Sequence, residues 1–207
     1  MTIAKTYRIE TDRLVIRCYQ PSDAIKLKDA ITESLEHLLP WMPWAKNEPE
    51  DLEAKINWVR IFRGQFDLGK DYTFGIFDKT ENEFIGSTGL HTRAGQDARE
   101  IGYWIHVKHI HQGFALETVS ALTKVAFEIE KLSRLEIHCE ADNVRSQNVP
   151  KKLGYQLEAT LKKRITGANG ELKDAMIWTM FKSDYERSPL RDMRIRAFDI
   201  MGRAIDL

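Results

Sequence analysis

The sequence predicts one α/β domain organised around a mixed sheet. Two observations lead to this prediction. A strand opens the chain and strand-like runs dominate its middle, and a strand–helix–strand–helix unit followed by a hairpin comes after them. Strand runs combined with an alternating unit of this kind indicate a mixed α/β sheet. At 207 residues the chain has the usual length of one large domain.

The N-terminal part of the chain contains one predicted strand and two predicted helices. Alternating apolar and charged residues predict a strand over residues 7–18. A helix is expected directly after Pro21, because proline is favoured at the first helical position. A second helix is expected over about 49–69, where apolar residues recur on one face. Residues 38–45, rich in proline and tryptophan, suit neither a helix nor a strand.

The rest of the chain carries the alternating unit and a closing hairpin. The predicted strands cover residues 71–78, 83–91, 99–107, 134–141, 155–164 and 172–181. The predicted helices cover about residues 113–130 and 145–153, and a turn is expected at 167–170. We expect a single domain over residues 1–187 and a C-terminal extension over 188–207. The extension carries no recognisable motif, and its apolar residues could form a short helix on the domain or on a partner subunit.

Composition limits the classes of protein that need to be considered. The chain has 31 basic and 31 acidic side chains and a formal net charge of zero, which argues against nucleic acid as its main partner. Its two cysteines, Cys18 and Cys139, are too few for a disulfide framework. No apolar run is typical of a signal peptide or reaches the roughly 18 residues of a membrane span. We therefore expect a cytoplasmic protein without a membrane partner.

A strand–loop–helix segment is the first candidate functional feature. Gly113 stands where the helix of residues 113–130 begins, and small Ala115 follows. Backbone amides at a helix N-terminus bind pyrophosphate well, and glycine lets the phosphates approach the backbone closely. The alternative is an ordinary strand-to-helix turn. Neither the GxxxxGK[ST] loop nor the GxGxxG fingerprint occurs, which excludes the kinase-like and dehydrogenase-like interpretations.

Three motifs in order connect this segment to a known family. Residues 100–104 read EIGYW, residues 112–115 read QGFA, and residues 142–155 contain D-N-x-x-S-x-x-V-x-x-x-L-G-Y. Together with TDRLVIR at 11–17 and LPWMPW at 39–44, they resemble the GNAT superfamily of N-acetyltransferases, and within it the RimJ/RimL family. The resemblance covers about residues 8–182.

The resemblance implies a fold and a binding mode for acetyl-CoA. In the GNAT acyl-CoA N-acyltransferase fold, helices flank a mostly antiparallel sheet whose parallel strands 4 and 5 splay apart; here these are residues 99–107 and 134–141. The pantetheine arm lies in the gap between them. The resemblance implies cofactor contacts at Ile105, His106 and Val107 for the arm, at His111, Gln112, Gly113, Phe114 and Ala115 for the pyrophosphate, and at Asn143 and Ser146 for both parts.

Amine acetylation requires a neutral amine and benefits from a proton donor to the departing thiolate. The resemblance places Glu100 near the acceptor amine as the candidate general base; a salt-bridged carboxylate is the alternative. Pro150 stands where many members of the superfamily have a tyrosine, which leaves the general acid open. Cys139 and Ser146 are candidates, although Cys139 can also be a small buried side chain and Ser146 can bind the cofactor.

Trp41 and Trp44 are expected to line the acceptor pocket, or else to pack a proline-rich connector. The histidines do not have the spacing of metal ligands, so no metal site is expected. We expect transfer of an acetyl group from acetyl-CoA to a primary amine, and the RimJ/RimL resemblance suggests the N-terminal amine of a ribosomal protein as this acceptor. A small amine (an amino acid, polyamine or antibiotic) as acceptor and a non-catalytic acyl-CoA-binding protein remain alternatives. The resemblance also suggests a homodimer.

Overall fold

The structure, a computed structural model, describes residues 6–167 and 170–207, so the turn predicted at 167–170 lies partly outside the described residues. The strands are β1 (Arg8–Glu10), β2 (Leu14–Cys18), β3 (Tyr72–Asp78), β4 (Phe84–His91), β5 (Ala98–Ile105), β6 (Arg134–Glu140), β7 (Gln156–Thr166), β8 (Leu172–Phe181), β9 (Arg196–Phe198) and β10 (Ala204–Ile205). The helices are α1 (Ala24–Leu38), α2 (Leu52–Asp67), α3 (Phe114–Glu128), α4 (Val144–Lys152) and α5 (Lys182–Tyr185).

All ten strands form one sheet in the order β10-β9-β1-β2-β3-β4-β5-β6-β8-β7. Within the described chain, only β5 and β6 pair in parallel, and their pairing extends from Ala98 to Glu100 on β5. Beyond Glu100, β5 stays paired with β4 up to Ile105, while β6 stays paired with β8 along its whole length. The two strands therefore diverge, which confirms the mixed, mostly antiparallel sheet with a splayed parallel pair.

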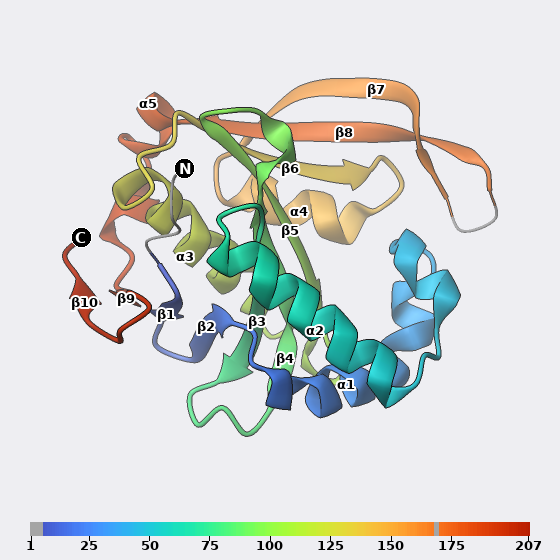
Figure 1. Cartoon of the computed structure of the whole chain (residues 1–207). Helices are drawn as coiled ribbons and strands as arrows, with labels where there is room; N and C mark the ends of the chain where they lie inside the picture. The colour runs from blue at the N-terminus through green and yellow to red at the C-terminus, as the bar shows by residue number, and fades with distance from the viewer. Residues whose placement is uncertain (1–5, 168–169) are drawn as a thin grey trace.

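Helices cover both faces of this sheet (Figure 1). Alternate strand residues face opposite sides. Accordingly, Val15 on β2 and Phe77 on β3 pack in the cluster under α1, whereas their neighbours Ile16 and Ile76 pack in the larger cluster that buries α3. Figure 1 shows α1 and α2 crossing one face while α3 lies on the other. The gap between β5 and β6 consequently opens between two layers of helix.

The structure corrects the prediction of a single strand over residues 7–18. Thr11 and Leu14 exchange backbone and side-chain hydrogen bonds, and this turn divides the segment into the antiparallel pair β1 and β2. The alternating run includes charged Arg17, which a half-exposed strand would direct to solvent. In the structure Arg17 is buried. Its guanidinium hydrogen bonds to Asp23 at 2.8 and 2.9 Å and also pairs with Glu81.

The C-terminal extension also differs from expectation. The possible short helix over residues 188–207 does not form; a single 3-10 turn at Pro189–Asp192 is followed by β9 and β10. Strand β9 pairs antiparallel with β1, and β10 pairs with β9. Ala197 on β9 is 1% exposed. The extension thus continues the sheet at its β1 edge, as Figure 1 shows.

Candidate active site

The splayed strand β5 offers unpaired backbone to the gap. Consecutive strand residues direct their N–H and C=O groups to opposite edges. Because the His106 amide donates to the carbonyl of Ile85 at 2.9 Å on the β4 side, the backbone groups of Ile105 and Tyr103 point towards β6. The Val107 amide donates to Oγ of buried Ser34 at 3.0 Å. Of the predicted contacts Ile105 to Val107, only Ile105 therefore has backbone groups that face the gap. Tyr103 also has backbone groups at this free edge and was not among the predicted contacts.

The predicted phosphate loop ends at the N-terminus of α3. Gly113 has φ of 81° and caps the helix, a conformation that favours glycine. His111 has φ of 63°. The first N–H groups of a helix have no intrahelical acceptor, and residues 114–116 line a cavity beside the gap. The predicted contacts at His111, Gly113, Phe114 and Ala115 also line this cavity.

Two side chains brace this loop from outside. Nε2 of the Gln112 side chain donates to the Lys108 carbonyl at 3.1 Å. This side chain is exposed and does not form part of the cavity wall. Arg13 donates to the Gln112 carbonyl at 3.0 Å and to Glu117 at 2.6 Å, and its guanidinium lies 4.5 Å from the ring centre of Phe114. The sequence analysis did not assign Arg13, although it lies in the TDRLVIR motif.

The cavity at the loop has a volume of about 490 Å³ and a distinctive charge. Five of its lining side chains are basic: His37, His109, His111, Arg145 and Lys152. None of the described residues that line it is Asp or Glu. A cationic cavity at a helix N-terminus suits a polyanion. These side chains, the α3 amides and the free edge of β5 fit the diphosphate and the pantetheine arm of acetyl-CoA.

A second, larger cavity of about 1040 Å³ lies on the side of the sheet covered by α1 and α2. Aromatic side chains form much of its wall, and Glu100, His138 and Glu140 lie on its strand side. The residues common to both cavities are Trp41, Met42, Tyr103, Trp104, Asn143 and Ser146. The two cavities therefore meet where the strands diverge, an arrangement that lets two substrates meet from opposite sides.

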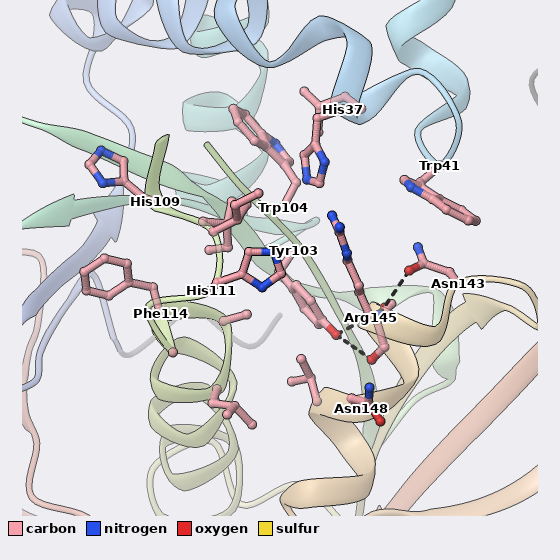
Figure 2. A pocket seen from close by; sticks show the side chains of 18 of the residues that line it. His37, Trp41, Tyr103, Trp104, His109, His111, Phe114, Asn143, Arg145 and Asn148 are labelled. Carbon is pink, nitrogen blue, oxygen red and sulfur yellow. Dashed lines mark hydrogen bonds between the residues drawn. The ribbon is translucent and has the colours of Figure 1, made fainter. Parts of the chain in front are cut away.

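Hydrogen bonds order this junction (Figure 2). The Tyr103 hydroxyl lies 3.1 Å from the Ser146 carbonyl and 3.2 Å from Ser146 Oγ. Asn143 Oδ1 accepts the Ser146 amide at 3.0 Å and so caps α4. Burial raises the pKa values of the Tyr103 hydroxyl and the Cys139 thiol. Cys139 is 6% exposed and lines the larger cavity. Both groups therefore remain protonated near neutral pH.

Glu100 lies in the larger cavity as half of an ion pair. Its oxygens accept from Arg93 at 2.6 and 2.7 Å, and Oε2 lies 3.6 Å from His138 Nδ1. Burial tends to raise the pKa of Glu100, but hydrogen bonds from Arg93 and the nearby positive charges outweigh it and hold the pKa below its usual value. Glu100 is thus both a salt-bridged carboxylate and a wall residue of the cavity.

His138 is a candidate that the sequence analysis passed over. Its Nε2 lies 2.7 Å from Glu136 Oε2, its side chain is one-third exposed, and it lines the larger cavity. The alternation of β6 places Glu136, His138 and Glu140 on one face, opposite Cys139. That alternation was the signal available in the sequence, and the parallel register that sets Glu136 beside Glu100 comes from the structure.

Both tryptophans lie in a cavity wall, and Trp44 is also packed among other aromatic rings. Trp41 lines both cavities, and Trp44 lines the larger one. Trp44 also packs against Trp58 and Trp104, with ring centres 5.9 and 6.2 Å apart. Across residues 6–167 and 170–207, no group of three His, Cys, Asp or Glu side chains could hold a metal ion. None of the helices in this part is long and apolar enough to cross a membrane.

Comparison with known proteins gives independent evidence for the family of this chain. The acetyltransferase (GNAT) domain family matches residues 13–156. The uncharacterized N-acetyltransferase YoaA of Bacillus subtilis (strain 168) is 29% identical over 175 residues, covering 84% of this chain and 96% of that protein. The [ribosomal protein uS5]-alanine N-acetyltransferase of Escherichia coli (strain K12) is 27% identical over 183 residues, covering 86% and 92%.

Solved structures have the same fold. The RimL ribosomal L7/L12 α-N-protein acetyltransferase in complex with coenzyme A superposes with a TM-score of 0.75 at 21% identity, covering 83% of this chain and 95% of that one. The chain belongs to the GNAT acetyltransferase family. It is an N-acetyltransferase, an enzyme that moves an acetyl group onto an amine.

Proposed function

We propose that the protein uses acetyl-CoA to acetylate the N-terminal α-amine of a protein, and that this protein is ribosomal. The junction of the two cavities carries the proposal, because it joins a cationic cofactor cavity to an open acceptor cavity of about 1040 Å³. Cavities that hold a drug-sized molecule measure about 300–1,000 Å³. The acceptor cavity therefore has room for a peptide terminus of several residues. The relative from Escherichia coli, which acts on uS5 alanine, supports the same acceptor.

In the transfer step, the amine nitrogen bonds to the thioester carbonyl carbon and the carbon–sulfur bond breaks. The amine nitrogen gives up a proton, and the CoA sulfur gains one. An α-ammonium with a pKa near 8 is largely protonated at neutral pH, so the acceptor side needs a group that takes its proton. The thiolate side benefits from a group that supplies one.

Glu100 and His138 form the proton-accepting pair in this proposal. The lowered pKa keeps Glu100 anionic at neutral pH, so it attracts the ammonium and is a weak base on its own. His138 supplies a ring nitrogen as proton acceptor, and Glu136 holds the His138 ring through Nε2. Nδ1, which faces Glu100, then takes the proton.

On the thiolate side, Ser146 and Cys139 are the proton donors in this proposal. Ser146 Oγ lies 3.2 Å from the Tyr103 hydroxyl, which donates a hydrogen bond to the serine oxygen as the serine gives up its proton. The raised pKa of Cys139 keeps its thiol protonated and able to donate, although it also slows donation. Ser146 has the additional role of holding the cofactor with Asn143 and the α3 amides.

The decisive experiment measures CoA release from acetyl-CoA with peptides that carry a free N-terminus. Matched controls are the same peptides with an acetylated N-terminus, and polyamines, free amino acids and aminoglycosides complete the panel. We expect turnover with the free termini alone, and at least a tenfold loss of kcat in Glu100→Gln. Turnover with a small amine only supports the small-molecule alternative. Tight acetyl-CoA binding without any turnover supports a binding protein and contradicts the proposal.

We further propose that the enzyme works in the cytoplasm as a homodimer, without nucleic acid or a membrane. A ribosomal acceptor and two unpaired cysteines, Cys18 and Cys139, support the compartment. The RimJ/RimL resemblance supports the dimer. Light scattering after size-exclusion chromatography tests the assembly, and a mass of one chain over the micromolar range contradicts it.

A further inference from the structure

The cofactor cavity contains a cationic cluster that neither the motifs nor the helix N-terminus explains. His37 comes from the end of α1, His111 from the loop before α3, and Arg145 from the first turn of α4. All three line the cavity of about 490 Å³. Figure 2 shows the side chains of His37 and Arg145 pointing towards each other across this cavity, with His111 beside them. The end of α1, the loop before α3 and the first turn of α4 thus direct basic side chains into the same cavity.

No carboxylate balances this cluster within the described residues. His37, His111 and Arg145 take part in none of the ion pairs found there, and the cavity wall they share contains no acidic side chain. Glu33, one turn before His37 on α1, is paired instead with Lys108 at 2.7 Å and His106 at 3.0 Å. Unpaired positive charge around a cavity attracts an anion into it.

His37 is the member of the cluster whose charge depends most on that anion. Burial lowers the pKa of His37, and the positive charges of Arg145 and His111 lower it further. Those two groups, from α4 and from the loop before α3, are the charges that reach the imidazole from the packed elements. The ring is half-buried. In the free protein His37 is therefore neutral at a pH where an exposed histidine would still be partly charged.

We propose that His37, His111 and Arg145 clamp the diphosphate of acetyl-CoA against the N-terminus of α3, and that His37 takes up a proton when the cofactor binds. This rests on the proposed acetyl-CoA-dependent activity and adds to it a pH-sensitive cofactor site. The anion removes the repulsion that keeps His37 neutral and replaces it with attraction. Cofactor affinity is consequently highest at acid pH and falls as pH rises through the pKa of His37 in the complex. By linkage, the fall reaches at most about tenfold per pH unit.

Calorimetry on the purified protein tests this without any acceptor amine. The probe is dephospho-CoA, because the 3′-phosphate of CoA titrates near pH 6 and would add its own proton change. Binding is measured between pH 5.5 and 8.5 in buffers of different ionisation enthalpy, which reports the protons taken up per ligand. We expect uptake of up to about one proton in the range where affinity falls. His37→Gln removes most of the uptake and flattens the pH dependence, and Arg145→Gln weakens binding about tenfold at every pH.

His91→Gln is the matched control, because it removes a histidine that pairs with Asp71 away from this cavity. It leaves the proton uptake of the wild type in place. Thermal melts of each variant verify folding, so a loss of uptake with an unchanged melting temperature reports on the clamp. Dephospho-CoA binding without proton uptake overturns the clamp but leaves the acetyltransferase activity intact. Uptake with CoA alone overturns the assignment to the diphosphate. Failure to bind either ligand contradicts the proposed function itself.

Discussion

The ion pair of Arg93 and Glu100 allows a quantitative test of how the acceptor site is built. Arg93 makes two short charge-assisted hydrogen bonds, at 2.6 and 2.7 Å, to a carboxylate that is only 7% exposed. Breaking a fully buried pair from one side costs about 3–5 kcal/mol, because a charge stays buried without a partner. The Arg93 side chain, however, is 61% exposed, so water compensates for part of its loss. We expect Arg93→Gln to lower the free energy of unfolding by about 1–2 kcal/mol at pH 7.

Glu100→Gln, the conservative variant of the other partner, tests whether the cost comes from an unpaired buried charge or from a general loss of contacts. Glu100→Gln removes the buried charge together with the ion pair and leaves only an exposed cation unpaired. Its cost is expected to be about 0.5 kcal/mol. The double variant should resemble Glu100→Gln rather than the sum of the two single variants, because both single changes act on the same interaction.

The lowered pKa of Glu100 also predicts how the stability difference changes with pH. The pKa of Glu100 is lowered in the folded protein, so its ion pair stabilises the fold above the unfolded-state pKa of about 4.3. That stabilisation is lost as pH falls through the folded-state pKa. Without Arg93, burial is the main remaining influence and raises the pKa. The stability difference between wild type and Arg93→Gln should therefore be full at pH 7 and shrink towards pH 3 in urea titrations. The reasoning is refuted if Arg93→Gln loses no more unfolding free energy than Glu100→Gln at pH 7. It is also refuted if the loss in Arg93→Gln is constant with pH.

Three further predictions concern the junction and the loop. Gly113→Ala weakens CoA binding by about 1–2 kcal/mol in calorimetry, because a Cβ is strained at φ of 81° and the free loop relaxes out of the conformation that binding requires; Gly64→Ala in the last turn of α2, with open space at its Cβ, leaves the affinity unchanged and serves as control. Ser146→Ala lowers kcat about a hundredfold at saturating acetyl-CoA if the serine donates the proton, and Cys139→Ala then retains nearly full kcat; the reverse pattern assigns the proton to the thiol. Asn143→Ala removes the α4 cap and lowers stability by about 1 kcal/mol in urea unfolding, and an unchanged stability contradicts the capping role.

Much of the fold follows from local patterns. Helical spacing of apolar residues located α1, α2 and α3, and short alternating runs located β3 to β8 within a few residues of their ends. Over residues 7–18 the pattern predicted one strand with a charged, exposed face. It failed because Arg17 is buried by its pairing with Asp23 and Glu81, which lie outside this segment. It failed again over residues 188–207, where the short strand β9 forms because β1 presents an open edge to it.

The sequence alone determined the fold class, the family and the position of the proposed phosphate loop, since periodicity and motif spacing are properties of neighbouring residues. Only the tertiary structure decided that Glu100 is paired with Arg93, that His138 faces the acceptor cavity, and that His37 and Arg145 meet across the cofactor cavity. Each of these depends on how α1, α4 and the splayed strands pack against one another. Charges interact over a few ångströms in space, and those distances are set by burial of the two apolar clusters rather than by separation along the chain.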